Sequence, residues 1–234
     1  MNIVFPRLYA IIDSALLTIS ELALAETLAG SGVELIQYRN KKAPPRSLFE
    51  ISRRLSNGLA QRGARFIVND RPDIALLAGA GGVHVGQDDL GVDEARAICG
   101  SERWVGVSTH TLDQVEAADR TSADYIALGP IFPTTTKQNP DAVVGTELLR
   151  RARQITAKPL VAIGGITLGR AAEVYLAGAD SLAVVRDLIC AGSPGERARE
   201  YLEVAASTAS RKAGSSAGST FTPNASSEAW SPPK

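Results

Sequence analysis

The stretch Phe66-Ile67-Val68-Asn69-Asp70 shows the pattern that decides the fold, because a short apolar run ends directly on polar residues. Strands buried on both faces of a parallel sheet have this composition, whereas antiparallel hairpins alternate more between apolar and polar residues. Similar runs recur along the 234-residue chain. The strands expected from them cover residues 8–12, 34–38, 65–68, 82–85, 104–107, 125–128, 160–163 and 182–185.

The segments between these runs have the spacing of amphipathic helices, as in Leu22, Ala25 and Leu28. Parallel strands need such crossover helices. Small residues such as Gly178-Ala179-Asp180 precede several runs and suit a tight turn from a helix into a strand. An open doubly wound sheet could hold the same alternation, but eight strand and helix pairs favour closure. We therefore predict an α/β fold of the (β/α)8 TIM-barrel type.

The composition divides the chain into one domain and a tail. Residues 1–211 are expected to form a single TIM-barrel catalytic domain. From residue 212 the chain is rich in Ser, Gly, Pro, Ala and Thr, with Phe221 and Trp230 as its aromatic residues. Such a segment buries too little apolar surface to become ordered. We expect residues 212–234 to be a disordered tail.

The charge balance narrows the range of partners. The chain has 25 Lys plus Arg and 25 Asp plus Glu, so no net field attracts nucleic acid or an acidic membrane. No apolar run approaches the roughly 20 residues of a membrane span, and no leader is recognised, so a cytoplasmic location is expected. Cys99 and Cys190 fit no metal-ligand spacing and are expected to be buried thiols. The number of subunits stays open, a homo-oligomer included.

Polar residues that follow the strands are the candidate functional residues, because the chemistry of this fold takes place where strands end. They include three cations, Arg39, Lys41 and Lys137, and two carboxylates, Asp70 and Asp89. Cations alone would indicate a phosphate site. Cations beside two carboxylates indicate a polyphosphate with Mg²⁺, which is usually held by one or two carboxylates and phosphate oxygens. Further neutral donors come from Asn69, Ser108, Thr134, Thr135 and Thr136.

Each of these signals also has a structural explanation. A lone Arg-x-Lys at a strand end is more often a solvated pair, and Asp70 and Asp89 could cap the helices that follow them. His84 lies within a strand, where a hydrogen-bonded barrel residue is more common than a base, and His110 could start a helix. The Gly164-Gly165 pair could be a plain turn, although the loops after strands seven and eight of a barrel often expose amides to a phosphate.

Four blocks, in this order, resemble the thiamine-phosphate synthase family from about residue 8 to residue 188. They are Gln37-Tyr38-Arg39-Asn40-Lys41, Phe66-Ile67-Val68-Asn69-Asp70-Arg71, Gly82-Val83-His84-Val85-Gly86-Gln87-Asp88-Asp89 and Leu128-Gly129-Pro130-Ile131-Phe132-Pro133-Thr134-Thr135-Thr136-Lys137. The resemblance implies a transferase that joins 4-amino-2-methyl-5-(diphosphooxymethyl)pyrimidine to a thiazole phosphate. Its products would be thiamine phosphate and diphosphate. The family's reaction is dissociative, through a pyrimidine carbocation that the thiazole nitrogen captures.

The resemblance also implies a role for individual residues. The pyrimidine diphosphate would be bound by Gln37, Tyr38, Arg39, Asn40, Lys41, Asn69, Ser108 and Lys137. The thiazole phosphate would be bound by Thr134, Thr135, Thr136, Gly165, Val185 and Arg186. One Mg²⁺ per subunit would be bound by Asp70 and Asp89. Arg39, Lys41 and Lys137 would act catalytically, because they stabilise negative charge on the departing diphosphate.

The chain departs from the family pattern at Arg186, where the family usually has a small hydroxyl residue such as Ser. The guanidinium either points into the barrel mouth and binds the thiazole phosphate, or points outward toward a carboxylate such as Asp187. The outward arrangement leaves the backbone amides of Gly165 and Arg186 for the phosphate. It is the one that we expect, because the family geometry uses the backbone at this position.

Two other functions stay open. A thiazole tautomerase of the same barrel family would need a base such as His110 and would have no use for Asp70, Asp89 or residues 37–41. A non-catalytic sensor of thiamine intermediates would be favoured by loss of the metal carboxylates or of Lys137, and the chain has all three residues. The sequence therefore favours the synthase, without deciding whether its thiazole substrate is carboxylated.

Overall fold

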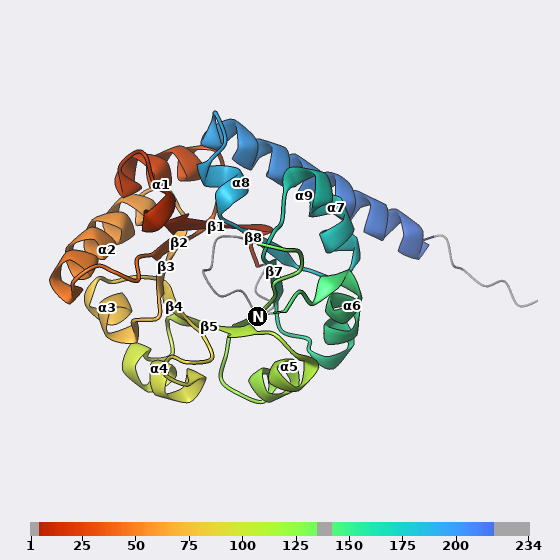
Figure 1. Cartoon of the computed structure of the whole chain (residues 1–234), viewed down its shortest axis with the longest axis horizontal. Coiled ribbons are helices and arrows are strands. Elements are labelled where there is room, and N and C mark those ends of the chain that lie inside the picture. Colours follow the sequence, from red (N-terminus) through yellow and green to blue (C-terminus); the bar gives the residue numbers. More distant parts are fainter. Residues whose placement is uncertain (1–4, 135–141, 218–234) are drawn as a thin grey trace, which may run out of the picture.

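The computed structural model describes residues 5–134 and 142–217, with side chains to residue 211. Within these residues, eight parallel strands form a closed barrel in sequence order, and β8 pairs with β1 to close it. Helices surround the barrel as an outer ring (Figure 1). The predicted (β/α)8 TIM barrel is therefore confirmed.

The strands lie close to the expected runs. They are β1 Leu8–Asp13, β2 Leu35–Arg39, β3 Arg65–Asn69, β4 Gly82–Val85, β5 Trp104–Thr109, β6 Tyr125–Leu128, β7 Leu160–Ile163 and β8 Ser181–Val184. The helices are η1 Ser14–Leu16, α1 Glu21–Gly30, α2 Pro45–Ala60, α3 Pro72–Leu77, α4 Val92–Cys99, α5 Leu112–Asp119, α6 Gly145–Ile155, α7 Leu168–Leu176, α8 Arg186–Ile189 and α9 Pro194–Ala217. Most strand residues are buried, which accounts for the apolar runs in the sequence.

The barrel encloses a separate inner core that closes its amino-terminal end. Phe5, which precedes β1, stacks on Trp104 at the start of β5, with the ring centroids 5.2 Å apart. Tyr125 of β6 projects into the same interior and lies opposite Gly106 of β5. A Cβ atom at Gly106 would lie only 2.0 Å from Cζ of Tyr125, so the tyrosine ring requires glycine there. The interior is thus filled at the amino ends of the strands and open toward their carboxyl ends.

Helix α9 changes the expected domain boundary. It packs against α1, α7 and α8 and continues past Arg211 to Ala217. The expected start of the tail at residue 212 therefore falls inside a helix, because Lys212 and Ala213 are good helix formers that extend it. Residues 218–234, the rest of the expected tail, lie outside the described residues.

None of the helices in residues 5–134 and 142–217 is both long enough and apolar enough to cross a bilayer.

Candidate active site

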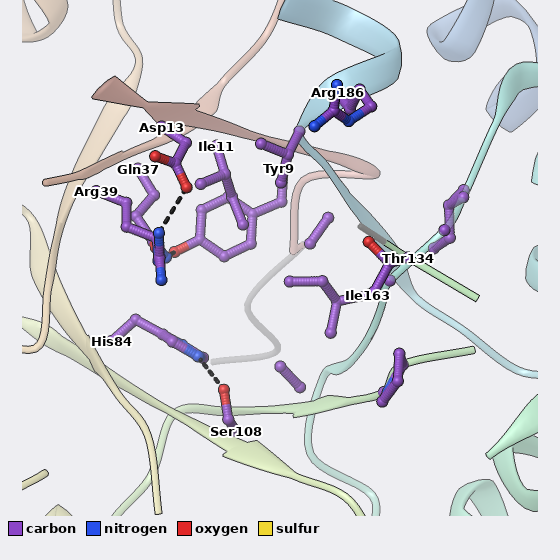
Figure 2. Close-up of a pocket in the computed structure, with 18 of the residues that line it drawn as sticks. Tyr9, Ile11, Asp13, Gln37, Arg39, His84, Ser108, Thr134, Ile163 and Arg186 are labelled. Atoms are coloured by element: carbon purple, nitrogen blue, oxygen red, sulfur yellow. Dashed lines mark hydrogen bonds and ion pairs between the residues drawn. The ribbon is translucent and has the colours of Figure 1, made fainter. Parts of the chain in front are cut away.

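A cavity of about 830 Å³ opens at the carboxyl ends of the strands. Its walls include residues from β1, β2, β3, β5, β7 and the start of α8, and several of them are shown in Figure 2. The fold thus brings together side chains that are far apart in sequence, from Tyr9 to Arg197. This is the location that the strand-end residues predicted.

Most of the predicted ligands border this cavity. Those that do are Gln37, Arg39, Lys41, Asn69, Asp70, Asp89, Ser108, Thr134, Gly165, Val185 and Arg186. Tyr38 and Asn40 do not border it. Thr135, Thr136 and Lys137 lie outside the described residues.

Tyr38 and Asn40 instead support the loop that follows β2. Tyr38 is buried on the helix-facing side of the strand, because alternate strand residues point to opposite faces. Its hydroxyl donates to Glu21 Oε1 at 3.2 Å and accepts from Asn40 Nδ2 at 3.0 Å. Asn40 Oδ1 accepts from the backbone amides of residues 42 and 43. Both residues therefore hold the turn that presents Lys41, rather than occupy a ligand's position.

Arg39 is held at the cavity by Asp13, a residue that the sequence interpretation missed. Arg39 Nη1 donates to Asp13 Oδ2 at 2.6 Å, and only 3% of Asp13 is exposed. Asp13 Oδ1 also accepts from the amide of Ala15, which begins η1. A buried carboxylate paired in this way fixes the guanidinium in one direction. Asp13 directly follows the first apolar run, so the strand-end rule, applied to β1, would have found it.

The two carboxylates meet in a charged cluster with Lys41. Asp70 forms an ion pair with Lys41, and its carboxyl also contacts that of Asp89. Burial raises the pKa of Asp70, Lys41 opposes this effect, and the Asp89 carboxylate reinforces it. Asp89 Oδ2 accepts from the amide of Gly86 at 2.7 Å. The pair therefore offers adjacent carboxylate oxygens to a cation at the edge of the cavity.

Neither carboxylate caps a helix, so the capping explanation is wrong. The residue before α3 is Arg71 and the residue before α4 is Gly91, and neither helix start donates a hydrogen bond to a capping side chain. Asp70 has a φ of 62°, the left-handed conformation, which non-glycine residues seldom adopt. Such a conformation costs free energy and is retained when the position of the side chain matters.

The donor set suits Mg²⁺ held partly by its substrate. Among the described residues, no three His, Cys, Asp or Glu side chains form a metal-binding group. Two carboxylates beside cations leave most coordination positions to water and to phosphate oxygens, which is the arrangement that Mg²⁺ prefers with nucleotides and diphosphates. Asp70 and Asp89 are therefore the residues that could hold such an ion.

His84 lies below this cluster, inside the barrel. Its Nδ1 is 3.1 Å from the Tyr125 hydroxyl. Its Nε2 is 2.9 Å from Ser108 Oγ, a contact marked in Figure 2. Burial lowers the pKa of His84 to about 4, so the imidazole is neutral near pH 7. His84 is thus a hydrogen-bonded barrel residue, as expected. His110 borders the cavity, and its Nδ1 lies 2.6 Å from the carbonyl oxygen of Gly129.

The opposite wall of the cavity is made by the loop after β7. Gly164 and Gly165 both have positive φ angles, 97° and 63°. A Cβ atom at Gly165 would lie 2.4 Å from the carbonyl oxygen of Pro133, so this loop packs directly on the segment after β6. Glycine is needed for both the conformation and the close approach.

Arg186 borders the cavity at the carboxyl end of β8 (Figure 2). The expected pair between Arg186 and Asp187 is wrong, because Asp187 Oδ2 accepts from Arg197, Tyr201 and the amide of Leu168. The outward direction that we expected for Arg186 therefore loses its proposed partner. Cys190, expected to be buried, is exposed at the end of the short helix α8.

Residues 8–188 match the family model of thiamine monophosphate synthase. The chain belongs to this family. Among similar proteins, the thiamine-phosphate synthase of Koribacter versatilis is 46% identical over 206 residues, which cover 85% of this chain and 95% of that protein. The thiamine-phosphate synthase of Methanospirillum hungatei is 38% identical over 198 residues, which cover 84% of this chain and 96% of that protein.

A solved structure agrees with the family assignment. The thiamine phosphate pyrophosphorylase of Pyrococcus furiosus superposes with a TM-score of 0.79 at 31% sequence identity. The match covers 86% of this chain and 96% of that one.

Helix α9 contributes site residues that lie beyond the family match. Arg197 borders the cavity and donates to Asp187 at 3.1 Å, and the Tyr201 hydroxyl donates to the same oxygen at 2.8 Å. The Tyr201 hydroxyl also lies 3.5 Å from the carbonyl oxygen of Ile166. These contacts fasten the loop after β7 to α9. The blocks that carry the family resemblance contain no signal for them, because they end before α9 begins.

Proposed function

We propose that this chain is a thiamine-phosphate synthase, which joins an aminopyrimidine methyl diphosphate to a thiazole phosphate and releases diphosphate. The observation that carries the proposal is one cavity with cations on two sides. Arg39 and Lys41 lie beside a carboxylate pair, and Arg170, Arg186 and Arg197 lie around the loops after β7 and β8. Two separate anionic groups of two substrates would account for both sets. The names of the similar proteins support the same reaction.

Asp70 and Asp89 are proposed to hold one Mg²⁺ per subunit together with oxygens of the diphosphate. The contact between the two carboxylates and the positive φ of Asp70 support this role. A bound Mg²⁺ would neutralise charge on the leaving diphosphate. Asn69 and Ser108, which border the same part of the cavity, would donate to substrate atoms.

Arg39 and Lys41 are proposed to stabilise the diphosphate as its bond to the pyrimidine methylene carbon breaks. Asp13 holds Arg39 in place at 2.6 Å, so this charge needs no rearrangement during the reaction. Gln37 would bind the pyrimidine ring from the cavity floor. Lys137 is assigned the same catalytic role from the resemblance alone. No general base is required, because the thiazole nitrogen supplies the electron pair that forms the new bond.

The thiazole phosphate is proposed to bind between the loops after β7 and β8. Gly165, Val185 and Arg186 border the cavity there, with Thr134 on the neighbouring segment, and Thr135 and Thr136 are assigned from the resemblance alone. We also propose a cytoplasmic location, because charged phosphate esters do not cross a bilayer unaided.

Arg186→Ser, which restores the residue usual in the family, is expected to raise the KM for the thiazole phosphate about tenfold, or about 1.4 kcal/mol. The reason is that Arg186 borders the cavity and Asp187 is occupied by other partners. The KM for the pyrimidine diphosphate should change little. Steady-state kinetics with each substrate varied in turn measures both values. An unchanged KM for the thiazole phosphate would show that the backbone amides bind this phosphate without the Arg186 side chain.

The proposed function is tested by incubating the purified protein with both substrates, with Mg²⁺ or with EDTA. Thiamine phosphate and diphosphate should appear in equal amounts and only with Mg²⁺. Isomerisation of the thiazole without the pyrimidine substrate would instead identify a tautomerase. Binding of either substrate with no product would identify a non-catalytic sensor.

A further inference from the structure

A chain of hydrogen bonds crosses the interior of the barrel from β2 to β5. It begins at Gln37 Nε2, which lies 2.6 Å from the Tyr9 hydroxyl, and continues to the Tyr125 hydroxyl at 2.9 Å. From there it reaches His84 Nδ1 at 3.1 Å, and His84 Nε2 lies 2.9 Å from Ser108 Oγ. The chain therefore joins two residues on different walls of the cavity, Gln37 and Ser108.

The bond directions in this series follow from its Gln37 end once every buried hydroxyl hydrogen is paired. An amide nitrogen can only donate, so the Tyr9 oxygen accepts from Gln37. Tyr125 is the other partner that the described residues give the Tyr9 hydroxyl, so the Tyr9 hydrogen is paired only when it is donated to Tyr125. Tyr125 then donates to His84 Nδ1. An imidazole nitrogen that accepts carries no hydrogen, so the hydrogen of His84 is on Nε2 and is donated to Ser108 Oγ.

The two ends therefore present opposite groups to the cavity. Gln37 Oε1 accepts no hydrogen bond from any residue in the described part of the chain, although only 2% of Gln37 is exposed. Because Nε2 is committed to Tyr9, this oxygen is the part of the amide left for a ligand. Ser108 Oγ already accepts from His84, so its hydroxyl hydrogen is the group left to donate. The floor of the site thus has an acceptor on β2 and a donor on β5.

No single member of this hydrogen-bond series can reverse alone, because its members are buried. Tyr9 and Tyr125 are both fully enclosed, and Gly106 leaves space for the Tyr125 ring in its observed position. Turning the Gln37 amide alone would set its oxygen against the Tyr9 oxygen, whose hydrogen is donated to Tyr125, so two acceptors would face each other. A buried group that loses its partner costs about 1–3 kcal/mol. The polarity of the two ends is therefore coupled across the barrel.

We propose that Tyr9, Tyr125 and His84 are positioning residues that set the hydrogen-bond polarity of the substrate ring site. This inference rests on the proposed function and names the feature of the pyrimidine that is recognised. Gln37 Oε1 would accept from an exocyclic amine, and Ser108 would donate to an acceptor atom of the substrate. A ring with an oxo group in place of the amine would set two acceptors against each other, so the site selects the amino form.

The test compares 4-amino and 4-oxo pyrimidine diphosphates as substrates of the wild type and of Tyr125→Phe. This substitution interrupts the series of hydrogen bonds at its centre. The wild type is expected to prefer the amino substrate by about 100-fold or more in kcat/KM. The variant should lose about tenfold or more of this preference, because the Gln37 amide is then free to turn. Its KM for the thiazole phosphate should not change. That combination would not arise from a general loss of structure.

Tyr175→Phe is the matched control. Tyr175 is also buried, its hydroxyl donates one hydrogen bond, to the carbonyl oxygen of Arg7 at 2.8 Å, and it does not border the cavity. This variant should keep the wild-type preference. Tyr9→Phe interrupts the series of hydrogen bonds at a second point. It takes the place of Tyr125→Phe if the Tyr125→Phe variant does not fold.

Two outcomes separate the inference from the proposed function. If the wild type forms thiamine phosphate but Tyr125→Phe and Tyr9→Phe keep its full preference for the amino substrate, the inference is overturned and the function stands. If the wild type forms no product, the function fails. Calorimetric binding of the two pyrimidine diphosphates then tests the proposed hydrogen-bond polarity. Equal affinities of the wild type for both compounds would overturn the inference.

Discussion

Asp70→Asn is expected to lower kcat/KM for thiamine phosphate formation by about 100-fold or more, because it weakens the site of the Mg²⁺ that would neutralise charge on the departing diphosphate, and loss of one group that stabilises a developing anion costs about this much. The variant keeps the shape of the side chain and removes its charge. Asparagine also tolerates the left-handed conformation that Asp70 adopts, with a φ of 62°, so the fold should be retained. Initial rates over a series of Mg²⁺ concentrations measure the effect, and the apparent Mg²⁺ affinity should fall as well.

Asp73→Asn is the control for this variant. Asp73 lies on α3, pairs with Arg71 and does not border the cavity. Its replacement removes a carboxylate of the same neighbourhood and should leave both kcat/KM and the Mg²⁺ dependence near the wild-type values. Wild-type activity of Asp70→Asn at limiting Mg²⁺ would show that Asp70 does not hold the metal.

Arg39→Met is expected to lower kcat by about 100-fold or more and to destabilise the protein by about 3 kcal/mol. The activity falls because a fixed cation is lost beside the diphosphate. The stability falls because Asp13, which is 3% exposed, is left as a buried carboxylate without its partner. Steady-state kinetics and urea denaturation measure the two effects separately.

The double variant Asp13→Asn/Arg39→Met separates the structural role of Arg39 from its catalytic role. Removing the charge of Asp13 relieves the unpaired buried carboxylate, so most of the lost stability should return. Activity should not return, because the cation is still missing. Recovery of activity in the double variant would mean that Arg39 acts only by pairing with Asp13.

The barrel was predictable because its evidence is local. Each strand is a run of buried residues such as Leu160–Ile163, and such runs are visible without knowledge of their neighbours. The place of most proposed site residues at one cavity was predictable for a related reason. In a parallel barrel all strands end on the same side, so residues such as Arg39, Asp70 and Ser108 meet in one cavity although they come from different strands.

Residues whose role depends on direction or on distant contacts were not predictable in this way. Tyr38 and Asn40 belong to a strand-end block, but the pleat and the turn direct them away from the cavity. The series of hydrogen bonds through Tyr9 and Tyr125 depends on ring positions inside the closed barrel. The sequence around Gly106 does not indicate that this glycine makes room for the Tyr125 ring. The Asp187 contacts of α9 join segments with unrelated local patterns.

The attachment of α9 to the loop after β7 has a consequence for protein engineering. A shortened barrel that ends at residue 188, where the family match ends, would lack Arg197 and Tyr201 and would leave Asp187 holding that loop through the amide of Leu168 alone. The smallest portable catalytic unit therefore includes α9. A fused domain or an immobilisation tag belongs beyond this helix, whose far end extends past the outer ring, away from the barrel (Figure 1).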